Sequence, residues 1–354
     1  MTSPATPAVL LVTRDELLLD DLLRLAAAAG TTLDVAHDST AALRGWGAAS
    51  VVLVGADQAE VLATHRPARR EGVHVVANGP VDDALFRSAL AAGAADVVEL
   101  PASDAWLVEL LTDAADGGTR RARTLGVVAG SGGAGATTFA CALALTGAAD
   151  GPAVLVDLDP LGPGVDRVVG LDAGHDPSSG ARWDVLVGSH GRLGSRSLRE
   201  ALPDKDGLAV VTWPVGPAVG LDVASVREVL SAAQRGHDLV VVDLPRWVDD
   251  LTAEVVSRCD RVLVVTEPTV AGVASAGRVA ARLRPLNRDV ALLVRGARTA
   301  VTADQVADIL ELPLLAEVPT QRRLAEHLDL GLGPVHGRRS ALARAARSVL
   351  GSVA

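Results

Sequence analysis

A glycine-rich stretch, GSGGAGATT at residues 130–138, has the composition and spacing of a phosphate-binding loop. It stands between TLGVVA, a run typical of a strand, and FACALALTG, a run typical of a helix. In such a loop, backbone N–H groups and the start of the following helix bind phosphate oxygens. Gly130, Gly135 and Thr137 are in register with the motif G-x-x-x-x-G-K-[S/T], but Ala136 replaces its lysine. These residues predict a phosphate site that lacks its usual positive side chain.

Three aspartates follow strand-like runs in the same part of the chain. Asp157 and Asp159 end the run AVLVDLD, and Asp243 follows the apolar residues of DLVVVDLPR, which is the form of a Walker B motif. Ligands of open α/β sheets bind at the carboxyl ends of the strands. We therefore expect all three aspartates beside the glycine loop. The alternative for each is an ordinary cap of a turn or helix.

Two successive alternations of short apolar strands and helical runs position these residues. The first covers residues 8–115 and contains five strand-like runs, which implies a small doubly wound parallel sheet. A polar, basic stretch at residues 116–124 is typical of a linker. The second alternation covers residues 125–354 and predicts a larger, mostly parallel α/β sheet. Its expected strands are LGVVAG, AVLVDLD, LAVVTW, DLVVVDLP, RVLVVTEP, VALLVRG and LLAEVP.

Composition narrows the class of protein further. The 354 residues are 49% hydrophobic and carry a net charge of −10, which argues against disorder and against a protein devoted to nucleic acid. The chain has no apolar run of membrane-spanning length and no signal peptide, so we expect a cytoplasmic protein. Cys141 and Cys259 stand in apolar helical contexts as reduced core residues. Lys205 is the only lysine, so any lysine-dependent chemistry must use it. The carboxyl-terminal part is locally basic through Arg278, Arg282, Arg284, Arg288, Arg322, Arg323, Arg338 and Arg339.

The first domain resembles a response-regulator receiver, with a CheY-like, flavodoxin-like fold, chiefly through ALAAGAADVVELP at residues 89–101. The resemblance places Gly55 where the phosphoacceptor aspartate should stand, and Asp57 comes two residues too late to replace it. Asp15 survives near the first strand, and Leu100 occupies the position of the lysine before the proline. Since phosphoryl transfer needs carboxylate-bound Mg²⁺ and a cation, we expect a degenerate receiver used for docking or dimerisation.

The second domain resembles the MinD/ParA family of deviant-Walker-A ATPases, whose P-loop reads KGGxGKTT. Ser131 takes the place of the family's signature lysine, and Ala136 takes the place of its loop lysine. The positions that fit the family's loop are Gly132, Gly133, Ala134, Gly135, Thr137 and Thr138. The resemblance implies an ATP or ADP site that retains its backbone cradle but lacks both lysines.

The resemblance also implies roles for the acidic residues. Thr137 and Asp243 would bind Mg²⁺, with Asp157 as a further candidate ligand, and Asp159 would orient the attacking water. The family's adenine-holding asparagine falls near Val294 and Arg295, neither of which can take its part. Losing a well-placed cation slows phosphoryl transfer by roughly 10³–10⁵-fold, so we expect at most a weak ATPase. Arg246, just after the Walker B motif, is the nearest arginine in sequence that could replace a lysine.

A degenerate receiver joined to a MinD-like domain is similar to the CpaE/TadZ localisation proteins and to actinobacterial septum-site-determining (Ssd) proteins. This resemblance implies a localisation and regulatory role in cell division, pilus assembly or secretion, with protein partners at the septum or pole. One alternative is an active ParA/MinD-type ATPase that positions cargo on DNA or membrane, and another is a scaffold that ignores nucleotide. The resemblance leaves open whether the protein forms a homodimer. Membrane contact would be at most peripheral, through the terminal SALARAARSVLGSVA.

Overall fold

The computed structural model describes residues 9–115, 122–171, 180–188, 193–296, 301–335, 337 and 339–352. Contacts divide the chain into two compact units, residues 1–120 and 121–354. Most of the predicted linker, 116–124, lies outside the described residues. Its last two residues, however, belong to a strand that begins at Arg123. Arg123 and Thr124 are polar, so the sequence did not show that the strand begins there. In the structure the Arg123 side chain donates to the Leu350 carbonyl, and the Thr124 N–H donates to the Asp260 carboxylate.

The first unit is a five-stranded parallel sheet with the strand order β2-β1-β3-β4-β5. All five predicted strands are present, and helices pack on both faces. Its elements are β1 (Val9–Val12), α1 (Glu16–Ala28), β2 (Leu33–Ala36), α2 (Ser39–Gly45), β3 (Val51–Gly55), α3 (Ala56–His65), β4 (Val73–Asn78), α4 (Asp83–Ala92), β5 (Asp96–Leu100) and α5 (Asp104–Ala115). One core lies under α1 and α5 and the other under α2 to α4, as expected for a doubly wound sheet.

The second unit is built on an eight-stranded sheet with the order β13-β12-β11-β6-β10-β7-β9-β8. Every pair is parallel except β8 with β9. The seven predicted strands are β6 (Arg123–Ala129), β7 (Ala153–Asp157), β9 (Leu208–Val211), β10 (Leu239–Leu244), β11 (Arg261–Thr266), β12 (Val290–Arg295) and β13 (Leu314–Val318). The short edge strand β8 (Asp204–Lys205) was not predicted, because two polar residues carry no period-2 pattern.

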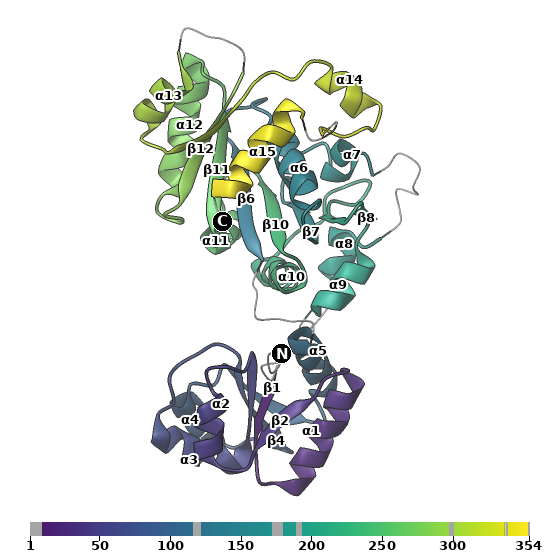
Figure 1. Cartoon of the computed structure of the whole chain (residues 1–354), viewed down its shortest axis with the longest axis vertical. Coiled ribbons are helices and arrows are strands. Elements are labelled where there is room, and N and C mark those ends of the chain that lie inside the picture. Colours follow the sequence, from purple (N-terminus) through teal and green to yellow (C-terminus); the bar gives the residue numbers. More distant parts are fainter. Residues whose placement is uncertain are drawn as a thin grey trace, which may run out of the picture. The chain divides into compact units, whose positions relative to one another are not determined.

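Helices cover both faces of this sheet. One face packs against α6 (Ala136–Gly147), α7 (Val165–Val169), α14 (Leu324–Asp329) and α15 (Ala341–Ser352). The other packs against α8 (Trp183–Leu186), α9 (Ser195–Ala201), α10 (Val223–Gly236), α11 (Asp250–Arg258), α12 (Val270–Leu283) and α13 (Ala303–Leu310). The carboxyl-terminal α15 lies beside α6 and buries Leu342 and Val349, so its apolar face belongs to the core (Figure 1).

The described residues contain neither a membrane-spanning helix nor a cluster of metal-ligating side chains. No described helix is both long and apolar enough to cross a membrane. Nor do described His, Cys, Asp and Glu side chains gather in threes around a possible metal position. The two cysteines cannot pair with each other, because Cys141 is buried in the core on the α6 face and Cys259 in the core on the opposite face.

Candidate functional site

The glycine loop connects the central strand β6 to α6. Gly133 and Gly135 adopt left-handed backbone angles, with φ of +76° and +86°, which glycine reaches without strain. Gly135 is the N-cap of α6, and no side chain caps the helix there. The first-turn N–H groups of a helix have no partner within the helix. The loop therefore leaves these donors and the positive end of α6 without a side-chain cap, a geometry suited to an anion.

Asp157 and Asp243 lie side by side beneath the loop. They are register partners at the ends of neighbouring strands β7 and β10. Along both strands, side chains alternate between the two cores, and this period places both aspartates on the face that carries α6. Asp157 is 1% exposed and Asp243 is 2% exposed. The structure thus brings together two carboxylates that stand 86 residues apart in the sequence.

The two carboxylates differ in how well they are satisfied. Asp157 accepts hydrogen bonds from the N–H groups of Asp159 and Val165 and from the Thr212 hydroxyl, at 3.1–3.3 Å. Even so, burial raises the pKa of Asp157 to about 6. Burial, and then the charge of Asp157, raise the pKa of Asp243 well above its usual value, while a hydrogen bond from Thr137 opposes the shift. Asp243 Oδ2 is buried without a hydrogen-bond partner.

A cation beside the Thr137 hydroxyl would satisfy this pair. Mg²⁺ is commonly held by one or two carboxylates together with water and phosphate oxygens. The buried, unsatisfied oxygen of Asp243 and the hydroxyl of Thr137 are donors of that kind. The residues present therefore fit Mg²⁺, and Asp157 stands next to Asp243 as a candidate for further support.

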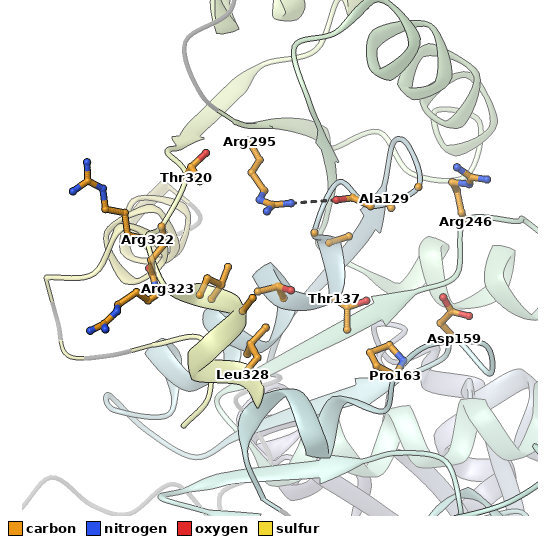
Figure 2. Close-up of a pocket in the computed structure, with 18 of the residues that line it drawn as sticks. Ala129, Thr137, Asp159, Pro163, Arg246, Arg295, Thr320, Arg322, Arg323 and Leu328 are labelled. Atoms are coloured by element: carbon orange, nitrogen blue, oxygen red, sulfur yellow. Dashed lines mark hydrogen bonds between the residues drawn. The ribbon is translucent and has the colours of Figure 1, made fainter. Parts of the chain in front are cut away.

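Asp159 lies at the edge of the site, partly exposed. One of its carboxylate oxygens accepts from the Leu161 N–H at 3.0 Å, and its carbonyl accepts from the Gly162 N–H. These bonds make Asp159 the anchor of a turn that follows β7. Its carboxylate borders the open cavity (Figure 2), so the predicted position beside the loop is what the structure shows.

A cavity of about 950 Å³ opens above the loop. Among the predicted residues, those that line it are Gly132, Gly133, Gly135, Ala136, Thr137, Thr138 and Asp159. Gly130, Ser131, Ala134, Asp157 and Asp243 do not line it. Gly130 and Ala134 pack inward, while the two acids lie beneath the floor.

Four arginines also line this cavity: Arg246, Arg295, Arg322 and Arg323. Arg246, the arginine that the sequence suggested, lies beside the loop: a methyl group built on Gly132 would be 3.7 Å from its Nη1. Arg295 contacts the loop directly, donating from Nη1 to the Gly133 carbonyl at 3.2 Å. Sequence reasoning did not anticipate this contact, nor the wall formed by residues 320–328. No local sequence motif indicates the Arg295 contact or this wall, because both depend on which loops meet at the end of the sheet.

Lys205, the single lysine of the chain, lies outside the cavity and binds backbone carbonyls. Lys205 Nζ donates to the carbonyls of Val169 and Gly170, at 3.0 and 2.9 Å, at the end of α7. It does not line the cavity. Among the described residues that line this cavity, every positive side chain is therefore an arginine.

In the first unit, the residues at the receiver-like position are satisfied internally. Asp57 accepts from the Thr13 hydroxyl and the Arg14 N–H, each at 2.8 Å. Its carboxylate fills the space that a side chain at Gly55 would need. Asp15 caps α1 by accepting from two of its N–H groups. Leu100, in place of the lysine, is buried.

Comparisons with known proteins agree with this architecture. Residues 12–122 match the family described as Rv3660c-like, CheY-like N-terminal domain, and residues 120–354 match the ParA family, described as NUBPL iron-transfer P-loop NTPase. The uncharacterized proteins Rv3660c and MT3760 of two Mycobacterium tuberculosis strains are each 37% identical over 342 residues, which cover 94% of this chain and 94% of each relative.

Solved structures share the fold of the second unit. A ParA family ATPase from Chlorobium tepidum superposes with a TM-score of 0.54 at 18% identity, covering 64% of this chain and 98% of its own. The septum site-determining protein MinD from Pyrococcus horikoshii, complexed with Mg-ADP, gives 0.54 at 19% identity, covering 66% and 96%. MinD of Aquifex aeolicus in complex with MinC gives 0.52 at 21%, covering 65% and 96%. The chain belongs to the ParA/MinD-type P-loop NTPases and carries a CheY-like amino-terminal domain of the Rv3660c type.

Proposed function

We propose that this protein is a localisation and regulatory factor of the septum-site-determining or CpaE-like type, which acts by binding protein partners. Its nucleotide site would bind ATP or ADP with Mg²⁺ weakly and hydrolyse ATP slowly. The observation that carries the proposal is a complete backbone cradle without any lysine. Ser131 and Ala136 stand at the two lysine positions, and Lys205 is bound elsewhere.

The geometry favours binding over catalysis. The glycine loop, the start of α6 and the Thr137–Asp243 pair retain the attractions for a phosphate with its metal. A lysine at 4 Å would add up to about 4 kcal/mol at an effective dielectric near 20, before desolvation is subtracted. Charge develops on the phosphates in the transition state, so the missing cations weaken catalysis more than binding. Support for a partner-based role comes from the family, since MinD of Aquifex aeolicus has been solved in complex with MinC.

Calorimetric titrations with ATP and ADP in the presence of Mg²⁺ test the binding part. Turnover, measured beside an intact P-loop ATPase, should be slower by at least about 10³-fold. The variant Ala136→Lys restores the loop lysine at its own position, since Ala136 is the first residue of α6 and lines the cavity. It should bind ATP more tightly than the wild type. Wild-type turnover comparable to the intact enzyme, and abolished by Asp159→Ala, would contradict the degenerate site.

The two alternatives from the sequence give different results. A ParA-type ATPase that moves cargo over DNA should bind random duplex DNA with a steep salt dependence, which fluorescence anisotropy at two salt concentrations detects. Two arginines of the basic region already have structural partners: Arg284 donates to the carbonyls that end α13, and Arg323 pairs with Glu326 at 3.1 Å. A scaffold that ignores nucleotide would give no heat with ATP or ADP.

A further inference from the structure

Arg295 is the last residue of β12, and its side chain turns back onto the glycine loop. Its Nη1 donates to the Gly133 carbonyl at 3.2 Å. Figure 2 shows Arg295 directed toward the loop, whereas Arg322 and Arg323 point away from it. The contact joins segments 162 residues apart. A guanidinium therefore lies against the backbone that forms the cradle.

The guanidinium covers Gly135, the residue next to the missing lysine. A methyl group built on Gly135 would lie 2.7 Å from Nη1, 3.1 Å from Cζ and 3.3 Å from Cδ of Arg295. The close approach of Arg295 thus depends on the absence of a side chain at Gly135. Ala136, which stands at the lysine position, follows directly and lines the same cavity. Arg295, at the end of β12, therefore places a positive charge beside the position where Ala136 supplies none.

Most of this guanidinium remains available. Arginine has five N–H donors in a planar fork that matches two phosphate oxygens, and one hydrogen bond goes to Gly133. Within the described ranges, no carboxylate forms an ion pair with Arg295, whereas Arg323 has Glu326. Arg295 is half-buried and borders the cavity. It can hold the loop through one N–H and offer others to a ligand.

We propose that Arg295 is the phosphate-binding residue of this site and replaces the loop lysine in space. The ligand it serves is a chain of phosphates, either inorganic or part of a nucleotide. The nucleotide form of this inference rests on the function proposed above. Arginine has no acceptor, so at this position it recognises phosphate and not the amino group of adenine.

Titration calorimetry with inorganic tripolyphosphate, ATP and ADP, all with Mg²⁺, tests the assignment on the full chain. Arg295→Gln removes the charge, and Arg295→Ala removes the side chain beyond Cβ. Each should weaken binding about 10- to 100-fold, the range of a charge-assisted hydrogen bond. Arg295→Lys keeps the charge but loses the planar fork, so its affinity should fall between those of the wild type and Arg295→Gln. Arg322→Ala is the matched control, because it removes an arginine from the same cavity that points away from the loop; it should change affinity by less than about threefold.

The outcomes separate this inference from the proposed function. Tripolyphosphate binding that depends on Arg295, without any binding of ATP or ADP, would support the inference and contradict the nucleotide site. ATP binding that is unchanged in Arg295→Gln and Arg295→Ala would overturn the inference alone. Tighter binding by both variants would also overturn it, since Arg295 would then block the cradle. A wild type that binds none of the three ligands would overturn both. Melting curves identify any variant that misfolds, and the Gln and Lys variants then decide between charge and shape.

Discussion

Replacement of Asp157 by asparagine should remove a pH-dependent loss of stability from the metal-free protein. Burial raises the pKa of Asp157 from 3.8 to about 6, so the folded state holds this proton more tightly than the unfolded chain does. The folded state therefore loses stability as the pH rises above 3.8, and the loss is complete above about pH 6. Asp157→Asn cannot ionise and should not show this loss.

The magnitude follows from the two pKa values. Raising the pKa of Asp157 from 3.8 to about 6 corresponds to about 3 kcal/mol when the whole range is crossed. Between pH 5 and pH 7.5 roughly half of this is lost, on the order of 1 kcal/mol, because the unfolded chain is already mostly ionised at pH 5. The raised pKa of Asp243 acts in the same direction, and its charge repulsion disappears with Asp157. For a domain of this size, about 1 kcal/mol corresponds to about 2–4 °C in Tm.

The assay is thermal or urea unfolding of the wild type and Asp157→Asn at low micromolar concentration with a chelator, at both pH values. The informative quantity is the change in their difference with pH, because asparagine also weakens the hydrogen bonds that Asp157 accepts. Asp159→Asn, which removes the partly exposed carboxylate of the same site, should follow the wild type. Mg²⁺ should raise the wild-type Tm more at pH 7.5 than at pH 5. Parallel loss of stability in wild type and Asp157→Asn would refute the reasoning.

Three further predictions concern the receiver-like domain, the base and assembly. Gly55→Asp should destabilise the receiver-like domain by about 1–3 kcal/mol, because the new Cβ would clash with the Asp57 carboxylate and lie 2.6 Å from the Thr13 hydroxyl. Thermal melting measures this loss, and labelling with acetyl phosphate should show that the variant is still not phosphorylated. ATP and GTP should bind with affinities within about tenfold, since Arg295 supplies no acceptor for adenine, and a calorimetric preference above that would contradict it. Mg-ATP should leave the sedimentation velocity profile at micromolar concentration unchanged, because Ser131 stands where the family resemblance implies a lysine that reaches across a dimer to the partner's nucleotide. A dimer that forms only with ATP would contradict this prediction.

Local sequence patterns were enough to predict the α/β architecture and most of the residues around the glycine loop. Alternating apolar strands and helices predicted both parallel sheets, because a buried parallel strand is a continuous apolar run bounded by turns. The glycine loop between strand and helix and the aspartates at strand ends are local patterns. Their convergence followed from the rule that the carboxyl ends of parallel strands share one edge. The absence of both lysines was equally plain, since Ser131 and Ala136 stand within the motif.

The arrangement of the charges around the site could not be predicted from the sequence, because it depends on contacts between distant segments. Arg295 is a single residue at the end of a strand, and nothing local shows that it turns toward Gly133. The shifted pKa values of Asp157 and Asp243 depend on burial and on the register between β7 and β10. Asp57 fills the space above Gly55 through bonds to residues more than 40 positions away. Electrostatic interactions of this kind depend on distance in space and on exclusion of water, and neither quantity is a property of a local sequence pattern.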